Sequence, residues 1–170
     1  MRFIADLHIH SKYARAVSPR MTLPELDRVV QIKGIQVMGT GDFTHPLWYE
    51  HLTKHLELAE VGLYRLKKEF QLDILRGTKA DTRFLLTTEI ACIYTRGGRG
   101  RRIHVLLFAP DLATVKKIND TLTARGKNLK SDGRPIIGLD VVEVLKIVLE
   151  ASPECVMVPA HIWTPWFGLL

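Results

Sequence analysis

The stretch DLHIH at residues 6–10 places an aspartate and two histidines at alternate positions in an otherwise apolar run. The apolar residues around them predict a β-strand over residues 2–9. Side chains alternate between the two faces of a strand, and Asp6, His8 and His10 therefore point the same way. Three polar groups that converge from one strand face indicate a site.

The bulk composition is that of one globular domain. The chain has 170 residues, of which 46% are hydrophobic and 25% charged, and this is enough for a single core. No apolar run is long enough to cross a membrane and no secretory signal opens the chain, so we expect a cytoplasmic protein without a membrane partner. Cys92 and Cys155 lie in apolar runs and are expected to be buried free thiols. The net charge of +6 favours a polyanionic partner.

Apolar strands alternate with amphipathic helices along the chain, and this alternation predicts an α/β fold. The first helix is expected over residues 22–34, with Thr22 as N-cap, Glu25 as its capping-box partner and Gly34 as the stop. Further helices are expected over 47–68, 111–124 and 139–152, and further strands over 35–42, 83–95, 102–110 and 154–163. The glycine-rich segment RGGRGR between two of these strands predicts a hairpin tip.

Other ionisable residues also lie in or at the ends of predicted strands: Asp42, Glu89, His104 and His161. The carboxyl ends of parallel strands gather at one edge of a sheet, so these groups are expected to meet. Ionisable groups in apolar strands are costly unless something compensates them. Divalent metal ions do so, because imidazoles and carboxylates are their usual ligands.

Each of these residues has an ordinary alternative when it is taken alone. His104 or His161 would more often be a hydrogen-bonded core histidine, and Glu89 could pair with an arginine. Asp42 could belong to a turn or cap a helix. His51 and His55 are spaced for metal binding on a helix, but their charged surroundings favour a solvated helix face. The metal hypothesis therefore depends on the joint pattern.

Two features bear on the substrate. The predicted hairpin tip carries four arginines, which suit contacts to a phosphate backbone but equally suit a solvated tip: Arg96, Arg99, Arg101 and Arg102. Three aromatic residues follow His161 closely: Trp163, Trp166 and Phe167. Aromatic groups beside a hydrolytic centre could stack an extruded base, with core packing as the alternative for at least one of them.

Six segments in this order resemble the PHP (polymerase and histidinol phosphatase) superfamily, and within it the endonuclease Q family. They are DLHIHSKYARAVS (6–18), GTGDFTHP (39–46), FLLTTEI (84–90), RIHVLLFAP (102–110), DGRP (132–135) and PAHIWTPWF (159–167). The resemblance covers nearly the whole chain. It implies a distorted seven-stranded β/α barrel, similar to a TIM barrel, with two or three metal ions at the carboxyl ends of the strands.

The resemblance also assigns residues. It implies six metal ligands, of which Glu89 bridges two ions and acts with His10 and Asp42 in catalysis: His8, His10, Asp42, Glu89, His104 and His161. The mixed nitrogen and oxygen donors favour Zn, Mn or Fe over Mg alone, although Mg is also used in such sites. Asp6, on the same strand face, is expected to orient the ring of His8 or His10 without binding a metal ion itself.

Two departures from the superfamily pattern shape the expected architecture. Many members have a histidine where this chain has Phe43, and the final Asp-x-His of a late strand has no counterpart here. Residues 1–170 are therefore expected to form one domain that is the N-terminal portion of a longer protein. Such a barrel is incomplete, and its open strand edges would favour pairing with a second copy of the chain.

The resemblance implies a metal-dependent endonuclease that acts on DNA. Members of the endonuclease Q family cut 5′ to deaminated bases such as uracil, hypoxanthine and xanthine, and at abasic sites. One alternative is a small-molecule phosphatase of the histidinol-phosphatase type, which would share the metal chemistry. The other is an inactive fragment that only binds metal or nucleic acid.

Overall fold

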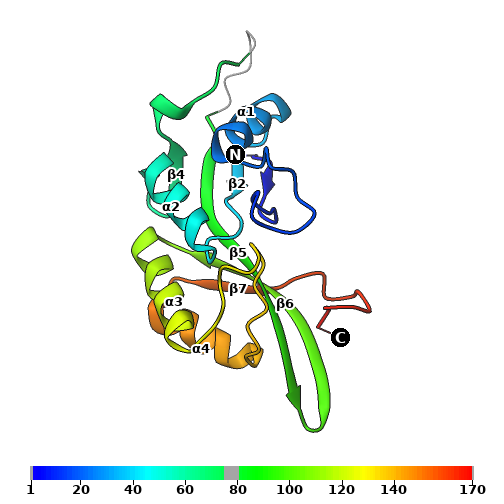
Figure 1. Ribbon diagram of the computed structural model, residues 1–170. Helices are drawn as coiled ribbons and strands as arrows, with labels where there is room; N and C mark the ends of the chain where they lie inside the picture. Colours follow the sequence, from blue (N-terminus) through cyan, green and yellow to red (C-terminus); the bar gives the residue numbers. More distant parts are fainter. Residues whose placement is uncertain (1, 75–80, 170) are drawn as a thin grey trace.

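The computed structural model describes residues 2–74 and 81–169, which form a curled half-barrel sheet with helices against it (Figure 1). The expected α/β class is confirmed. The strands in these residues are β1 (Ala5–Asp6), β2 (Val37–Gly39), β3 (Leu56–Glu60), β4 (Leu63–Leu66), β5 (Arg83–Arg96), β6 (Arg99–Ala109) and β7 (Val156–Pro159). The α-helices are α1 (Leu23–Lys33), α2 (Pro46–His55), α3 (Leu112–Ala124) and α4 (Val141–Ala151), with a short 3-10 helix at Lys68–Phe70.

The long strand β5 organises the sheet. Its first residues pair in parallel with β2, which pairs in parallel with β1. On its other side β5 pairs with β4 of the antiparallel β3–β4 hairpin. Beyond Leu85 it leaves β2 and pairs antiparallel with β6, which in turn pairs with β7. The sheet is therefore mixed, and only its first part is the parallel sheet that the sequence predicts.

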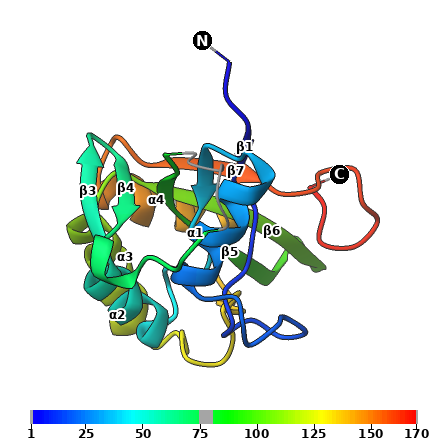
Figure 2. The same cartoon turned by 90° about the horizontal axis from the view of Figure 1, so that it is seen from above.

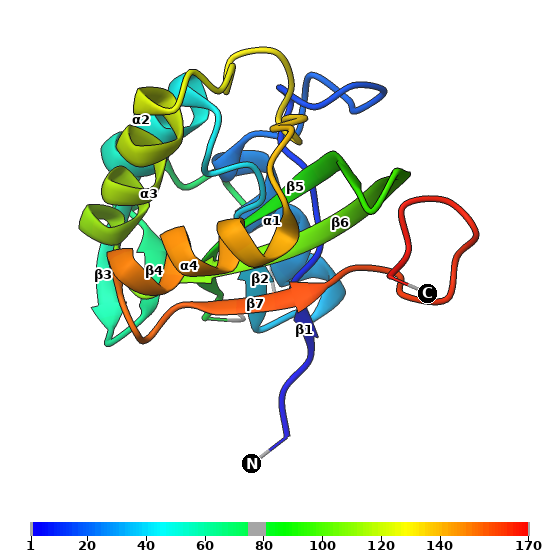
Figure 3. The same ribbon diagram turned by 90° about the horizontal axis from the view of Figure 1, so that it is seen from below.

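The helices cover the sheet with apolar faces. Helix α4 packs against β6 and β7, and α3 lies beside it (Figure 3). The largest fully buried side chains include Trp48 of α2, Phe43 of the turn before it and Phe84 of β5. Both cysteines are buried free thiols, as expected, and burial raises the pKa of Cys92 to about 12.

Most predicted helices and the central hairpin are confirmed. Asp111 and Asp140 cap α3 and α4 by accepting hydrogen bonds from the backbone amides of Thr114 and Val142. At the tip of the β5–β6 hairpin, Gly97 and Gly98 have φ values of 58° and 73°. Two consecutive positive φ angles make the tight turn that matches the twist of a hairpin.

The predicted helix over 47–68 is wrong in its second half. Helix α2 ends at His55, and the antiparallel hairpin of β3 and β4 follows it. Gly62, with φ 78°, makes the turn between the two strands. The apolar spacing of this segment fits either a helix or strands, and the pairing of Tyr64 with Phe84 of β5 decides for strands.

Other boundaries are also corrected. The predicted strand 2–9 is reduced to β1, and the strand predicted over 154–163 is reduced to β7. Thr22 makes no side-chain cap on α1, and Glu25 accepts hydrogen bonds from Arg20 and Arg28, so the predicted capping box is absent from α1. Gly34 ends the helix in the left-handed conformation, as predicted.

Both ends of the described chain leave the half-barrel. Residues before β1 extend away from the sheet, and the segment after β7 forms a separate loop (Figure 2). Among the described residues, β1 pairs only with β2 and β7 only with β6. Association of two copies through these edges stays a prediction. No helix within the described ranges is long and apolar enough to cross a membrane.

Candidate metal centre

Glu89 of β5 lies at the centre of the ionisable cluster. The last residue of β5 that pairs with β2 is Leu85, and Glu89 follows it in the part that pairs with β6, opposite Leu106. Glu89 therefore stands just beyond the carboxyl end of the parallel strands, where α/β folds build their sites. Its side chain is 1% exposed.

The two carboxylate oxygens of Glu89 serve two different pairs of histidines. Oε2 lies 3.3 Å from Nε2 of His8 and 3.0 Å from Nε2 of His10. Oε1 lies 2.9 Å from Nδ1 of His104 and 3.4 Å from Nε2 of His161. In each group of three residues, the potential ligand atoms lie within 4.8 Å of one another. The arrangement has the donors for two cations that share one carboxylate.

The hydrogen bonding of Glu89 supports this interpretation. Oε1 is buried and accepts no hydrogen bond from any described residue, although Nδ1 of His104 lies 2.9 Å away. That nitrogen is within hydrogen-bond reach of Nε2 of His161 instead, at 3.2 Å. A buried carboxylate oxygen without a hydrogen bond is costly unless a further group binds it. Imidazole nitrogens and carboxylate oxygens together fit a divalent transition metal such as zinc or manganese.

Asp42 lies behind His10 and outside the two groups of three. Its Oδ1 is 2.9 Å from Nδ1 of His10, and its Oδ2 accepts hydrogen bonds from the backbone and hydroxyl of Ser11 at 2.6 and 2.7 Å. A carboxylate on the far nitrogen of a ligating imidazole fixes the orientation of the ring. The described geometry thus places Asp42 in a supporting position behind His10. Its predicted role as a direct ligand stays a prediction.

Electrostatics inside the cluster are strong. The hydrogen bond that His10 donates to Asp42, followed by that to Glu89, raises the pKa of His10 to about 9. Burial acts to raise the pKa of Glu89, but His10, His104 and His8 outweigh it and hold that pKa far below its usual range. Glu89 is therefore an anion at any physiological pH and is available as a ligand.

Backbone strain is concentrated at this site. Asp42 and His161 have φ values of 49° and 32°, in the left-handed region that non-glycine residues seldom adopt. Gly41 precedes Asp42 with φ 64°, and a Cβ there would lie 2.5 Å from the backbone oxygen of Ile9. Such strain persists only where the surrounding structure imposes it, which is common in functional sites.

Asp6 does not orient either imidazole through a hydrogen bond in the described structure. Its Oδ1 accepts a hydrogen bond from the backbone amide of His8 at 3.4 Å, and its side chain is exposed. The strand ends before the two histidines, so the strict alternation of side chains over residues 6–10 is lost. The role of Asp6 in orienting an imidazole stays a prediction, and the contact described here is with the backbone of His8.

The aromatic residues after β7 differ in their surroundings. Phe167 packs its ring on His104, with ring centroids 4.2 Å apart, and its carbonyl accepts a hydrogen bond from the backbone of His104. Trp163 and Trp166 are 81% and 66% exposed. The guanidinium of Arg102 lies 5.9 Å from the ring centroid of Trp166. Phe167 thus packs against His104, a candidate metal ligand, whereas Trp163 and Trp166 face solvent.

The arginines of the hairpin are exposed, as a surface for a polyanion requires. They lie at the end of the arm that β5 and β6 extend beyond the rest of the molecule (Figure 1): Arg96, Arg99, Arg101 and Arg102. Arg96 also pairs with Asp140 at 3.3 Å. The other histidines lie on or before α2, where His45 stacks on Tyr13 and His51 stacks on His55.

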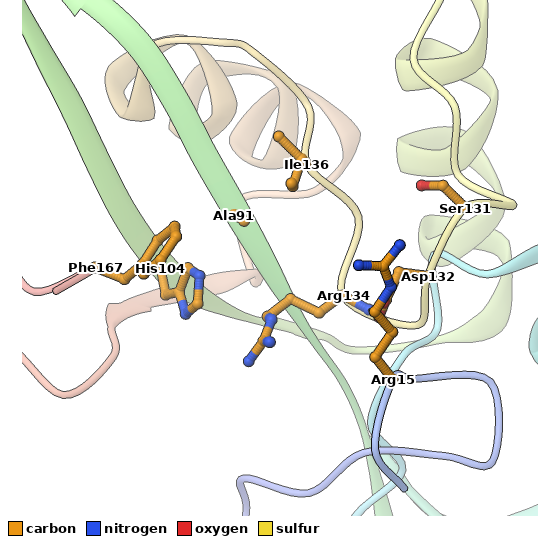
Figure 4. Close-up of a pocket in the computed structure, with 8 residues that line it drawn as sticks. All are labelled: Arg15, Ala91, His104, Ser131, Asp132, Arg134, Ile136 and Phe167. Carbon is orange, nitrogen blue, oxygen red and sulfur yellow. The ribbon is translucent and has the colours of Figure 1, made fainter.

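One residue of the site was not identified from the sequence. Arg134 donates a hydrogen bond from Nη1 to Oε2 of Glu89 at 3.2 Å. It lines a pocket of about 320 Å³ beside the cluster, together with His104 and Phe167 (Figure 4). The DGRP segment at 132–135 was the available signal, because it stands out in a loop between two predicted helices.

Comparison with solved structures identifies the class. The fold is similar to that of endonuclease Q, consistent with a PHP-type protein. The lesion-specific endonuclease PfuEndoQ from Pyrococcus furiosus is 31% identical, with a TM-score of 0.76. A complex of endonuclease Q with a 27-mer duplex substrate that has an abasic lesion at the active site is 32% identical, with a TM-score of 0.77. Each match covers 97% of this chain and 36% of the solved chain.

Two curated relatives are themselves uncharacterized. A protein of Methanocaldococcus jannaschii is 28% identical over 94% of this chain and 16% of its own length. The protein YqxK of Bacillus subtilis is 31% identical over 96% of this chain and 41% of its own length. The chain therefore spans less than half of each relative and of each solved chain. No profile of a protein family matches the chain.

Proposed function

We propose that this chain carries the catalytic centre of a divalent-metal-dependent DNA endonuclease. In this proposal it hydrolyses the phosphodiester bond 5′ to deaminated bases (uracil, hypoxanthine or xanthine) or at abasic sites, as in DNA repair. The observation that carries the proposal is the position of Glu89, whose two oxygens each face a separate pair of histidines.

The side chains in the two groups define what the centre could hold. His8 and His10 would hold one ion with Oε2 of Glu89, and His104 and His161 would hold a second with Oε1. Bound divalent ions would supply a hydroxide nucleophile near neutral pH and neutralise charge on the phosphoryl oxygens. Asp42 would keep Nε2 of His10 directed at the centre by holding its Nδ1.

Features outside the centre support DNA as the substrate. The chain has a net charge of +6, and the exposed arginines of the β5–β6 arm suit contacts to a phosphate backbone. Trp163 and Trp166 present exposed aromatic surface on which a base could stack. Two solved structures with a similar fold are a lesion-specific endonuclease and an endonuclease Q in complex with duplex DNA that has an abasic lesion.

A nicking assay tests the proposal. Metal-free protein is given zinc, manganese or magnesium and incubated with a labelled duplex that contains one deoxyuridine or one abasic site. We expect a single nick 5′ to the lesion in the presence of at least one metal, no nick in the undamaged duplex, and no nick with E89Q. Hydrolysis of histidinol phosphate with the damaged duplex left intact would contradict the proposal and favour a phosphatase. Bound metal without any hydrolysis would favour a binding fragment.

A further inference from the structure

The guanidinium of Arg134 lies where a metal centre would least favour a cation. It donates to Oε2 of Glu89, the same oxygen that faces His8 and His10. A guanidinium has no lone pair and cannot ligate a metal, and its positive charge opposes the binding of cations nearby. Its position is therefore explained only by an anion, either Glu89 itself or a further one.

The charges at the centre favour a further anion. Glu89 and Asp42 are the carboxylates that contact the imidazoles of the two histidine groups among the described residues. Two divalent ions together with Arg134 would carry more positive charge than these two carboxylates neutralise. Arg134 also has free N–H groups, because a guanidinium has five donors and, among the described residues, Glu89 is the one acceptor of its side chain.

The loop that carries Arg134 is held firmly against β5. The backbone of Ala91 donates to the carbonyl of Pro135 at 3.0 Å, and its carbonyl accepts from Ile137 at 3.1 Å. Gly133 lies so close to the carboxylate of Asp42 that a Cβ at this position would clash with it. The backbone around Arg134 is thus fixed by contacts to β5 and to Asp42. A fixed backbone reduces the conformational entropy that Arg134 would lose on binding an anion.

The pocket beside the cluster is lined by two arginines, which favour the binding of an anion. Arg134 and Arg15 enter it, and Asp132 lies 3.7 Å from the guanidinium of Arg15 (Figure 4). His104 and Phe167 form the wall toward the metal centre. The side chain of Arg134 is 40% exposed and that of Arg15 is 91% exposed, so Arg134 is the more restrained of the two.

We propose that Arg134 is a phosphate-binding residue of this site. Its free N–H groups bind a non-bridging oxygen of the substrate phosphate next to Glu89, and Arg15 adds a weaker contact at the outer rim. Arginine suits this role because its planar fork can bind two oxygens at once. The inference rests on the proposed function, since it takes a phosphate ester as the ligand of the centre.

The test uses inorganic phosphate as the probe and the zinc-loaded chain. Phosphate affinity is measured by isothermal titration calorimetry and zinc content by mass spectrometry, for the wild type, R134Q and R134K. The control is R125Q, which removes the same charge from an exposed pair with Glu143 at the end of α3. We expect R134Q to weaken phosphate binding by about tenfold or more with unchanged zinc. R134K keeps the charge but loses the fork, so its affinity falls in between.

The outcomes separate this inference from the proposed function. Equal phosphate affinity in R134Q and R125Q would overturn it, as would a wild type that binds no phosphate. Loss of zinc in R134Q, equal to the loss in E89Q, would also overturn it and make Arg134 a support for Glu89. If the wild type does not nick damaged DNA but the phosphate affinities follow the expected order, the proposed function fails and the assignment of Arg134 stands.

Discussion

The strand β5 carries two charged clusters that differ in how well their polar atoms are satisfied. At its beginning, Arg83 donates to both Glu60 and Asp81, and the carboxylate oxygens of these two residues accept its hydrogen bonds. Six residues further on, Glu89 is surrounded by four imidazoles, yet its Oε1 accepts no hydrogen bond from the described residues. The carboxylate oxygens of the first cluster all accept hydrogen bonds, whereas Oε1 of Glu89 in the second cluster still needs a group that binds it.

This difference separates a structural ion pair from a functional centre. The acids of the Arg83 cluster are largely exposed, with side chains 53% and 80% accessible, so water screens them and little else is required. Glu89 is 1% exposed, and its charge must be compensated from within the protein or by a bound cation. Exposure and hydrogen bonding together thus identify the centre better than the presence of charge does.

The largest effect is expected for E89Q. The amide offers one neutral oxygen in place of two charged ones, so neither group of histidines keeps its carboxylate ligand. Metal affinity should fall by more than about a hundredfold, measured as zinc or manganese content after dialysis. The matched change E60Q in the Arg83 cluster should leave the metal content unchanged. Equal metal content in E89Q and wild type would remove the assignment of the centre.

The second effect concerns G133A. The added Cβ would meet the carboxylate of Asp42 and approach the Cβ of Ala14 to 3.0 Å, so the loop or the carboxylate must move. Overpacking of this kind costs about 1–3 kcal/mol of unfolding free energy, which denaturant titration would detect. Metal affinity should also fall, since Asp42 orients His10. The control is G126A, whose added Cβ meets no other atom but whose left-handed backbone is strained. It therefore shows the effect of backbone strain alone, without contact to the site. Full metal affinity in G133A would contradict the supporting role of Asp42.

A smaller effect is expected for R83Q. This change removes the hydrogen bonds to Glu60 and Asp81 but keeps an apolar stem on the strand. The midpoint of thermal unfolding should fall by a few degrees, because the pairs are partly exposed. Metal content should not change. A loss of metal in R83Q would show that the two clusters of β5 are coupled and would break the comparison.

Asp27 of α1 provides a third case, a buried acid far from the centre. It is 4% exposed and accepts a hydrogen bond from the side chain of Gln31 at 2.7 Å, and burial raises its pKa. A raised pKa in the folded state stabilises the protein below the unfolded pKa, and this contribution is lost as pH rises through the folded pKa. D27N should therefore raise the unfolding free energy near pH 7 and have less effect near pH 4. A constant difference between pH 4 and pH 7 would contradict the raised pKa.

The smallest effect is expected for H51A. His51 lies on α2, where it stacks on Trp48 and His55 with ring centroids 5.8 and 5.1 Å apart. It belongs to neither group of potential ligands in the described structure. Metal content should match that of the wild type, and the unfolding free energy should change by less than about 0.5 kcal/mol. A clear loss of metal in H51A would place a ligand outside the centre described above.

Local signals in the sequence predicted the elements that local interactions determine. The cap at Asp111 and the glycines at 97 and 98 act within a few residues, and each of them appears in the structure. The hairpin of β3 and β4 was missed because its apolar spacing also fits a helix. Its pairing partner Phe84 lies twenty residues beyond Tyr64, and a short sequence window cannot contain it.

The candidate site shows the same division. The residue types that gather at Glu89 were predicted, because imidazoles and acids in apolar strands are unusual and need compensation. The hydrogen bond between Asp42 and His10 was not predicted, since it joins residues 32 positions apart. Arg134 was missed for the same reason, because it comes from a loop that long-range contacts, such as the pairing of residues 91 and 136, bring to the strand.

The continuous pairing of β5 with β6 also sets a length. Arg102 pairs with Ile93, which follows Glu89 by four residues, so Arg102 lies on the same face of the hairpin as Glu89 and, at about 3.4 Å per residue, about 14 Å from it. This distance corresponds to about four base-pair steps along B-form DNA. If the proposed DNA substrate lies along this face, Arg102 contacts it about four steps from Glu89. Removing two paired residues from each strand between these positions would then shift that contact, seen as a protected footprint, by about two steps.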